Sequence, residues 1–209
     1  MKKVLLSVIM LTTTSIFAQE FGVKAGSNIS NFRGKDFPDN TKSYVGYYAG
    51  LFIDIEIAEN LNIQPEVLYS NVGAKIDQGF MDKSKIDYIS VPVSLQYEVL
   101  DDLRIELIPQ IDFMMSSKIK LNRPDFNPGV PDPNDPVFVS SDEDFKDFTN
   151  KLNYGLGIGV NYEIFEGLGV NARYSMSLNE TFNQNLYLVG KNDSKYKNNV
   201  FHIGIFYKF

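Results

Sequence analysis

Apolar and polar residues alternate along eight segments of the chain, and turn-rich segments separate them. Alternation with a period of two residues is typical of a β-strand that has one face in an apolar environment and the other in a polar one. No segment has a sustained helical period. The pattern predicts eight strands, near residues 21–32, 44–57, 61–72, 85–99, 103–115, 151–164, 168–178 and 200–209.

The two faces of the predicted strands differ strongly in charge. Taking every second residue on the more apolar side of each strand gives 49 positions, and none of them is charged, although 22% of the whole chain is. The opposite face carries Lys24, Asn28, Gln64, His202 and many other polar residues, with glycine and serine between them. The strands therefore have one apolar face and one polar face.

The lengths of the connections indicate how these strands are arranged. Three connections are short turns (58–60, 100–102, 165–167) and four are long loops (33–43, 77–84, 122–150, 179–199). Alternating short and long connections, with strands long enough to cross a bilayer, are typical of outer-membrane barrels. Closure also removes the strand edges that lipid cannot solvate. The predicted fold is all-β, an eight-stranded antiparallel up-and-down transmembrane β-barrel.

Seven tyrosines lie on the apolar face, in two groups near the two ends of the predicted barrel. An aromatic ring with a polar hydroxyl suits the boundary between hydrocarbon and water, so these residues are predicted to form aromatic girdles. In a soluble core, each hydroxyl would need a buried partner. The girdles comprise Tyr97, Tyr162 and Tyr207 towards the short turns, and Tyr47, Tyr69, Tyr154 and Tyr174 towards the long loops.

Three prolines interrupt the predicted strands, at Pro65, Pro92 and Pro109. Proline has no backbone N–H to donate, and a closed barrel has no edge strand where that loss is harmless. We expect bulges or locally broken pairing at these positions.

The first residues predict export rather than a folded element. Met1-Lys2-Lys3 is a short basic segment, an apolar stretch follows to Phe17, and Ala18 is a small residue suited to a cleavage point. The apolar stretch is shorter than the roughly 20 residues of a membrane-spanning helix. Residues 1–18 are therefore predicted to be a signal peptide, and residues 19–209 the barrel domain of a Gram-negative outer membrane.

Composition excludes several classes of function. The 209 residues contain no cysteine and one histidine, His202, which excludes disulfides, thiolate chemistry and histidine-pair metal sites. The 20 basic and 26 acidic residues give a formal charge of -6 without a long basic run, which argues against a nucleic-acid partner. We expect no catalytic residues, no cofactor and no metal, hence no enzyme. His202 is expected to hydrogen-bond inside the barrel.

Charged residues on the inward face are the most suggestive group. The interior of an eight-stranded barrel is just wide enough to be filled by side chains, so acids and arginines there are expected to neutralise each other in a packed network. Proton or ion passage and a carboxylate pair for hydrolysis are the alternatives. The predicted interior polar network consists of Glu66, Glu98, Arg104, Glu106, Asp112, Glu163 and Arg173. Glycines 155, 157 and 159 are expected to form a strip of small residues beside bulky neighbours.

Segment 122–150 contains five of the nine prolines and then the acidic run 140–144. It is predicted to be an exposed loop, with adhesion, partner docking or cation binding as its functional alternatives. Its Asp-Pro-Asn-Asp-Pro run at 132–136 lacks the central glycine and the terminal glutamate of a calcium loop.

Several short motifs, in order along the chain, resemble the PorT-like outer-membrane β-barrel domain family, the porin family proteins common in Bacteroidetes. The opening strand 21–30, the Pro-Glu-x-x-Tyr motif at Pro65 and the Tyr-x-x-x-Pro motif at Pro92 carry the likeness over nearly the whole mature chain. The last residues, with Tyr207 and Phe209, are similar to the terminal aromatic signal read by the barrel assembly machinery. The resemblance implies a fold and an assembly route, and it transfers no catalytic residues.

Three functions remain open from the sequence. The leading hypothesis is a monomeric, non-enzymatic outer-membrane protein that contacts lipid and the assembly machinery, and whose external loops contact cell-surface partners. The second is a narrow pore or a secretion-accessory barrel, as the resemblance suggests. The third is a soluble periplasmic ligand-binding barrel with its apolar face turned inward. An eight-stranded barrel is too narrow for a wide diffusion pore.

Overall fold

A computed structural model describes residues 19–33, 41–78, 81–125, 137–144, 146–182 and 196–209. The predicted signal peptide, residues 1–18, lies outside the described residues. No helix in the described part is long and apolar enough to cross a membrane. The elements are β1 Gln19–Arg33, β2 Thr41–Ala58, β3 Leu61–Gln78, β4 Met81–Leu100, β5 Leu103–Asp125, β6 Val137–Asp144, η2 Lys146–Phe148, β7 Leu152–Phe165, β8 Leu168–Ser177 and β9 Lys197–Lys208.

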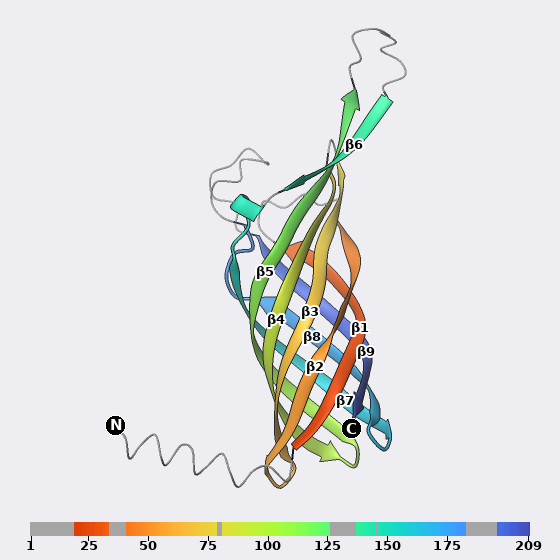
Figure 1. Ribbon diagram of the computed structural model, residues 1–209, viewed down its shortest axis with the longest axis vertical. Coiled ribbons are helices and arrows are strands. Elements are labelled where there is room, and N and C mark those ends of the chain that lie inside the picture. The colour runs from red at the N-terminus through yellow and green to blue at the C-terminus, as the bar shows by residue number, and fades with distance from the viewer. Residues whose placement is uncertain (1–18, 34–40, 79–80, 126–136, 145, 183–195) are drawn as a thin grey trace, which may run out of the picture.

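Eight of these strands close into a ring, each pairing antiparallel with both of its neighbours. β1 pairs with β2 and β9, β4 pairs with β5, and β5 pairs with β7. Among the described strands, β6 pairs with β5 alone and stands outside the ring. Figure 1 shows the strands inclined to the long axis of a narrow barrel, with β1 and β9 side by side. The predicted eight-stranded antiparallel barrel is confirmed.

The apolar face of the strands points out of the barrel. Leu51, Ile158 and Ile205 are about 60% exposed on the outer surface, whereas Lys24 and Glu66 are 2% exposed inside. Such a belt of exposed leucine, isoleucine and valine suits hydrocarbon as the surrounding medium. The soluble alternative required the apolar face to point inward, and the structure contradicts it.

The three short turns share one backbone geometry. Each leaves two residues between its strands, one fewer than predicted, and the second residue has a positive φ: 62° at Asn60, 66° at Asp102 and 79° at Gly167. Each hairpin has a register shift beside its turn. Asparagine, aspartate and glycine tolerate the left-handed conformation best, so the turn sequences suit this geometry.

The strand prolines interrupt pairing without shifting the register. Between β2 and β3 the ladder stops at the pair Phe52–Glu66 and resumes at Ile55–Ile63, so that Pro65 is skipped. The ladders skip Pro92 on its β3 side and Pro109 on its β4 side in the same way. The predicted broken pairing is confirmed, while the bulges lie elsewhere. Each proline pairs normally with its other neighbour, so the missing donor is lost from one ladder only.

The predicted loop 122–150 is wrong for much of its length. β5 continues to Asp125, β6 pairs back along it from Val137 to Asp144, and η2 follows. Figure 1 shows this hairpin rising beyond the long-loop end of the barrel. Residues 126–136, which contain four of the five prolines, lie outside the described residues. The two described strands of the hairpin contain only the fifth, Pro124. The run Val137-Phe138-Val139 has the composition of a strand.

The lumen is not polar along its whole length. At the long-loop end it holds an apolar cap of eight buried side chains. A register shift in the β4–β5 ladder lies between Asp87 and Tyr88, and beyond it the inward positions of β5 change parity, so that Met115 is exposed and Ile119 is buried. The strict alternation therefore holds over the predicted strand 103–115, and the parity of β5 changes only beyond its end. The apolar cap consists of Phe32, Val72, Ala74, Ile86, Tyr88, Phe182, Tyr196 and Val200.

Candidate functional site

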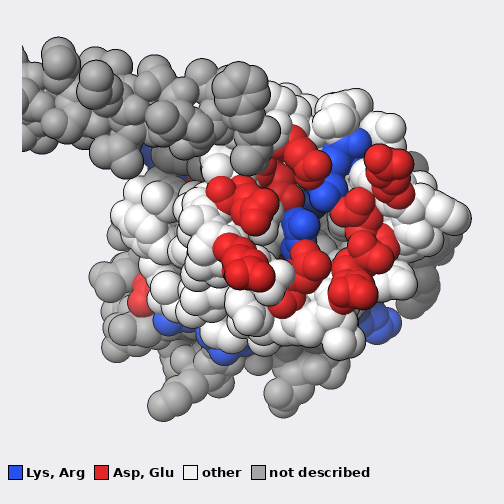
Figure 2. Space-filling model, turned by 90° about the horizontal axis from the view of Figure 1, so that it is seen from below, with Lys and Arg blue, Asp and Glu red and all other residues white. Residues whose placement is uncertain are grey.

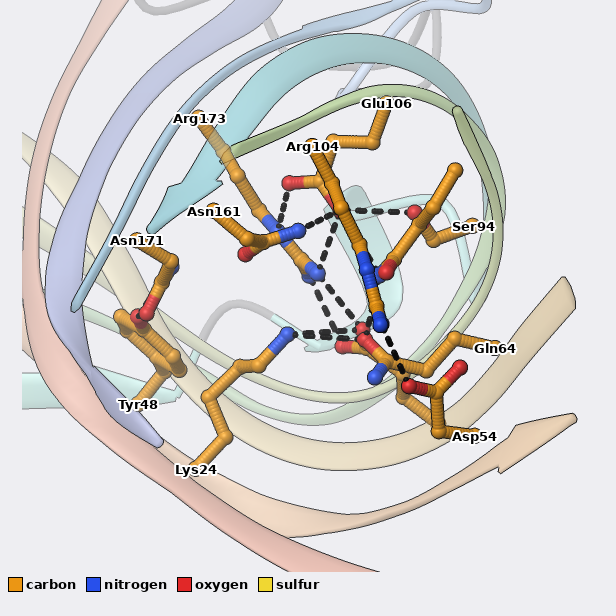
Figure 3. A network of polar contacts seen from close by, with 12 residues as sticks. Lys24, Tyr48, Asp54, Gln64, Ser94, Arg104, Glu106, Asn161, Asn171 and Arg173 are labelled. Atoms are coloured by element: carbon orange, nitrogen blue, oxygen red, sulfur yellow. Dashed lines mark hydrogen bonds and ion pairs between the residues drawn. The ribbon is translucent and has the colours of Figure 1, made fainter. Parts of the chain in front are cut away.

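A central ionic cluster, which consists of Lys24, Glu66, Glu106 and Arg173, spans the lumen (Figure 3). Arg173 on β8 donates from Nη2 and Nη1 to the two carboxylate oxygens of Glu66 on β3, at 2.6 and 2.8 Å. It also donates from Nε and Nη2 to the carboxylate of Glu106 on β5, at 2.6 and 2.9 Å. β3 and β8 lie four strands apart in a ring of eight, so the guanidinium bridges opposite walls.

Lys24 of β1 completes the charge balance of the cluster. Its Nζ lies 2.9 Å from Glu66 Oε1 and donates to Gln64 Oε1 at 3.2 Å. Two cations and two carboxylates therefore neutralise each other, and all four residues are buried. Buried charges are tolerated where every member is paired and hydrogen-bonded, as here, and bidentate arginine–carboxylate pairs fix the geometry as well as the charge.

Neutral side chains donate further hydrogen bonds to Oε2 of Glu106. Ser94 donates to Glu106 Oε2 at 2.6 Å, and Asn161 donates to the same oxygen at 2.9 Å. Gln96 bridges Glu106 and Gln64, at 3.4 and 2.8 Å. The cluster is thus embedded in a hydrogen-bonded layer contributed by most of the strands.

Glycines on β7 make room for this layer. Gly159 lies opposite both Glu106 and Arg173 in the sheet. A Cβ atom at Gly159 would lie 2.5 Å from Glu106 Oε1 and 2.8 Å from the Ala172 carbonyl oxygen. Gly155 and Gly157 similarly face the side chains of Gln110 and Ser175. The structure agrees with the expected strip of small residues beside bulky neighbours.

A second group of ion pairs lies at the short-turn mouth of the barrel. Arg104 Nη1 is 2.7 Å from Asp54 Oδ2, and its Nε is 3.2 Å from Glu98 Oε2. Lys208 Nζ is 2.8 Å from Glu163 Oε2 and 3.0 Å from a carboxylate oxygen of Glu20. Figure 2 shows acidic side chains around a few basic ones at this opening. Further exposed acids on the rim are Glu56, Glu59, Asp101, Asp102 and Glu166.

Asp112 stands apart from both groups of ion pairs. It is 5% exposed, and its carboxylate accepts from Gln110 Nε2 at 3.0 and 3.2 Å. No described residue forms an ion pair with it. It lines a cavity of about 30 Å³ together with Tyr88 and Asn153, whose Oη and Oδ1 atoms have no hydrogen-bond partner in the described part of the chain. A cavity of this size holds one or two water molecules.

The structure therefore divides the seven predicted interior residues into three places. Glu66, Glu106 and Arg173 meet in the central cluster, Glu98, Arg104 and Glu163 lie at the mouth, and Asp112 lies in the cavity towards the apolar cap. Sequence reasoning missed three partners, Lys24, Asp54 and Lys208. All three lie on the polar face of their strands, which the alternation in the sequence indicates. The sequence does not indicate which strands face each other across the lumen.

The remaining polar candidates have ordinary structural surroundings. His202 Nδ1 lies 2.6 Å from Asn28 Oδ1, and its ring stacks edge-on against Tyr48 with centroids 5.5 Å apart. Among the described residues, no group of three or more histidine, aspartate or glutamate side chains is arranged to hold a metal ion. The described side chains of the lumen thus make ion pairs and hydrogen bonds with one another.

The predicted girdle tyrosines lie on the outer surface. Tyr69 is partly covered by Tyr47, with ring centroids 5.8 Å apart, and the others are exposed. At the chain end the rings of Tyr207 and Phe209 meet edge-on at 5.4 Å, and the Phe209 N–H donates to the Phe21 carbonyl at 2.8 Å. The chain therefore ends at the outer surface of the β1–β9 seam. The exposed girdle residues are Tyr47, Tyr97, Tyr154, Tyr162, Tyr174 and Tyr207.

Comparison with known families decides the class of this barrel. The family model described as an outer membrane protein beta-barrel domain matches residues 17–183. The chain belongs to this family. The sequence resemblance to a family of outer-membrane barrels is thereby confirmed at the level of that broad family. A search of curated proteins finds no match.

Solved structures with the same fold include bacterial surface proteins. Ail, the attachment invasion locus protein of Yersinia pestis, has a TM-score of 0.52 at 12% identity, with 92% of this chain and 99% of that chain covered. Neisserial surface protein A has a TM-score of 0.51 at 14% identity, with 90% and 97% covered. At such low identity the likeness shows the fold alone. The family assignment and the exposed apolar belt support the outer membrane as the location.

Proposed function

We propose that this protein is a monomeric, non-enzymatic outer-membrane barrel whose lumen is closed by the central ionic cluster and whose long-loop end contacts partners outside the cell. The bridge from Arg173 across the lumen to Glu66 and Glu106 carries this proposal. Filled by paired side chains, an eight-stranded interior leaves no wide aqueous path. Contacts then have to be made by the ends of the barrel.

The long-loop end is the better candidate for such contacts. The β5–β6 hairpin rises beyond the barrel there, whereas the strand connections at the other end are two-residue turns. Rigid scaffolds commonly present binding surfaces on their longest connections. Ail, which shares the fold, is named for attachment and has been crystallised with sucrose octasulfate, a heparin analogue. A PorT-like role, and delivery by the assembly machinery through Tyr207 and Phe209, are finer parts of the same proposal.

Two measurements test closure and orientation separately. In planar bilayers the purified chain should give no steady conductance, and Glu66→Ala combined with Arg173→Ala should introduce one, whereas the outward Tyr174→Ala should not. Because the chain has no cysteine, single substitutions report orientation cleanly. A membrane-impermeant maleimide should label Lys146→Cys on intact cells and Glu59→Cys only after permeabilisation. The opposite labelling pattern would contradict the proposed orientation.

A narrow pore is the second candidate, because cavities lie on both sides of the central cluster. One holds Asp112, and the other, of about 30 Å³ at the mouth, is lined by Arg104, Glu98 and Lys24. Water in both would be separated only by the ion-paired layer. A wild-type conductance that Glu98→Gln or Arg104→Gln reduces would favour the pore and contradict closure.

A further inference from the structure

Five lysines meet on one face of the sheet formed by β3, β4 and β5. Residues directly opposite each other in an antiparallel pair point to the same side of the sheet. Lys83 of β4 lies opposite Lys75 of β3 on one side and opposite Lys120 of β5 on the other. Lys85, two residues further along β4, lies opposite Lys118 of β5. We call these five residues the lysine ladder.

The lysine ladder faces out of the barrel. Ala74, Ser84, Ile86 and Ile119, which alternate with it along the strands, are buried in the interior. Because successive side chains in a strand point to opposite faces, the lysines point outward. Lys75 and Lys118 are exposed, and Lys83, Lys85 and Lys120 are partly exposed.

Among the acids whose side chains the structure describes, Asp87 and Asp144 lie beside the lysine ladder. Asp87 is 3.9 Å from Lys85 Nζ, and β6 places Asp144 opposite Lys118 and Asp142 opposite Lys120. Asp144 is also 3.9 Å from Lys146, so its charge is shared. Like charges directly opposite each other destabilise a sheet. The register imposed by the barrel nevertheless holds Lys83 between two other lysines, which leaves a concentration of positive charge that an anion would relieve.

The position of the lysine ladder along the barrel indicates where that anion would come from. Met115, 57% exposed on the outer surface of β5, precedes Lys118 by three residues. Three residues of strand span roughly 10 Å, and with the usual tilt this gives about 7 Å along the barrel axis. The ladder therefore begins just beyond the apolar belt, at the level of the lipid head groups.

We infer that the lysine ladder is a binding site for the phosphate groups of the outer-leaflet glycolipid, lipopolysaccharide, packed against β3, β4 and β5. The inference rests on the proposed orientation, since only then does this end face the outer leaflet. Each lysine ammonium offers three donors, and cations at a membrane surface attract anionic head groups. Bound lipid would cover this outer wall below the β5–β6 hairpin.

Binding of purified phosphorylated lipopolysaccharide to the full, detergent-folded chain tests the site. We compare the wild type, Lys83→Gln combined with Lys118→Gln, and the matched control Lys146→Gln combined with Lys151→Gln, which removes two exposed lysines outside the ladder. Removing two ladder lysines should weaken binding by about tenfold or more and flatten its dependence on salt. The control should bind like the wild type. Heat-modifiable migration confirms that all three are folded.

Two further arms identify the source of the phosphate. Dephosphorylated lipopolysaccharide should bind far more weakly than the phosphorylated form, and excess inorganic phosphate should not displace the lipid. Equal loss in the ladder and control variants, unchanged binding of the ladder variant, or equal binding of dephosphorylated lipid would each overturn the inference. Displacement by free phosphate would also overturn it. Because this assay uses isolated protein, a wrong orientation is detected separately by the cysteine labelling.

Discussion

Two kinds of buried acid occupy the lumen, and they differ in what faces them. Glu66 accepts from Arg173 and Lys24, whereas Asp112 accepts only from neutral groups. Removing one partner of a buried ion pair leaves the other charge buried without a partner, which costs stability. Replacing an unpaired carboxylate by an amide removes a charge that was costly to bury. The same acid-to-amide change should thus have opposite consequences at these two positions.

Glu66→Gln is expected to lower the free energy of unfolding by about 3 kcal/mol, because Arg173 and Lys24 would share one carboxylate. Asp112→Asn is expected to leave stability unchanged or raise it. Denaturant titration in lipid vesicles, followed by heat-modifiable migration, measures both. Equal destabilisation by the two variants would show that Asp112 is paired as strongly as Glu66.

At the scale of elements, the β5–β6 hairpin is separable from the barrel. Beyond Leu121 the β5 strand pairs with β6 rather than with β4, and β6 pairs with no other described strand. The ring of pairings that closes the barrel is complete without it. The hairpin therefore projects from a barrel that closes without it. Such an arrangement suits the proposed role of the hairpin in binding partners.

Replacing residues 122–141 by a short glycine–serine linker should leave a folded barrel whose free energy of unfolding changes by less than about 1 kcal/mol, since exposed tips tolerate such changes. Heat-modifiable migration and denaturant titration in vesicles check this expectation. The same deletion should abolish contacts made by the long-loop end in a cell-surface binding assay. A chain that no longer folds would show that the hairpin contributes to barrel closure.

For the whole molecule, the decisive property is that hydrocarbon surrounds the apolar face. Ile158 lies near the middle of β7 and is 62% exposed, so Ile158→Lys should cost about 2–4 kcal/mol in a bilayer. Leu100→Lys, next to a short turn, should cost less than about 1 kcal/mol, because its ammonium reaches water. Unfolding titrations in vesicles compare the two. Equal costs would contradict a lipid belt centred on Ile158.

The sequence by itself predicted the eight strands of the ring, the closed barrel and which side chains share a face, whereas the choice between an outward and an inward apolar face was settled by the structure. These predictions follow from local rules, since alternation fixes which side chains share a face and the short turns fix which strands are neighbours. The pairing breaks at Pro65, Pro92 and Pro109 were foreseeable because proline always lacks the donor. The inward orientation of Glu66, Glu106 and Arg173 came from the same alternation.

Only the tertiary structure decided which charges meet. Arg173 and Glu66 are 107 residues apart, and they face each other because closure places β3 and β8 on opposite walls. The lysine ladder likewise depends on a register shift, which moves Lys118 and Lys120 to the outer face of β5. A one-residue bulge leaves little trace in local composition, yet it decides which side chains share a surface.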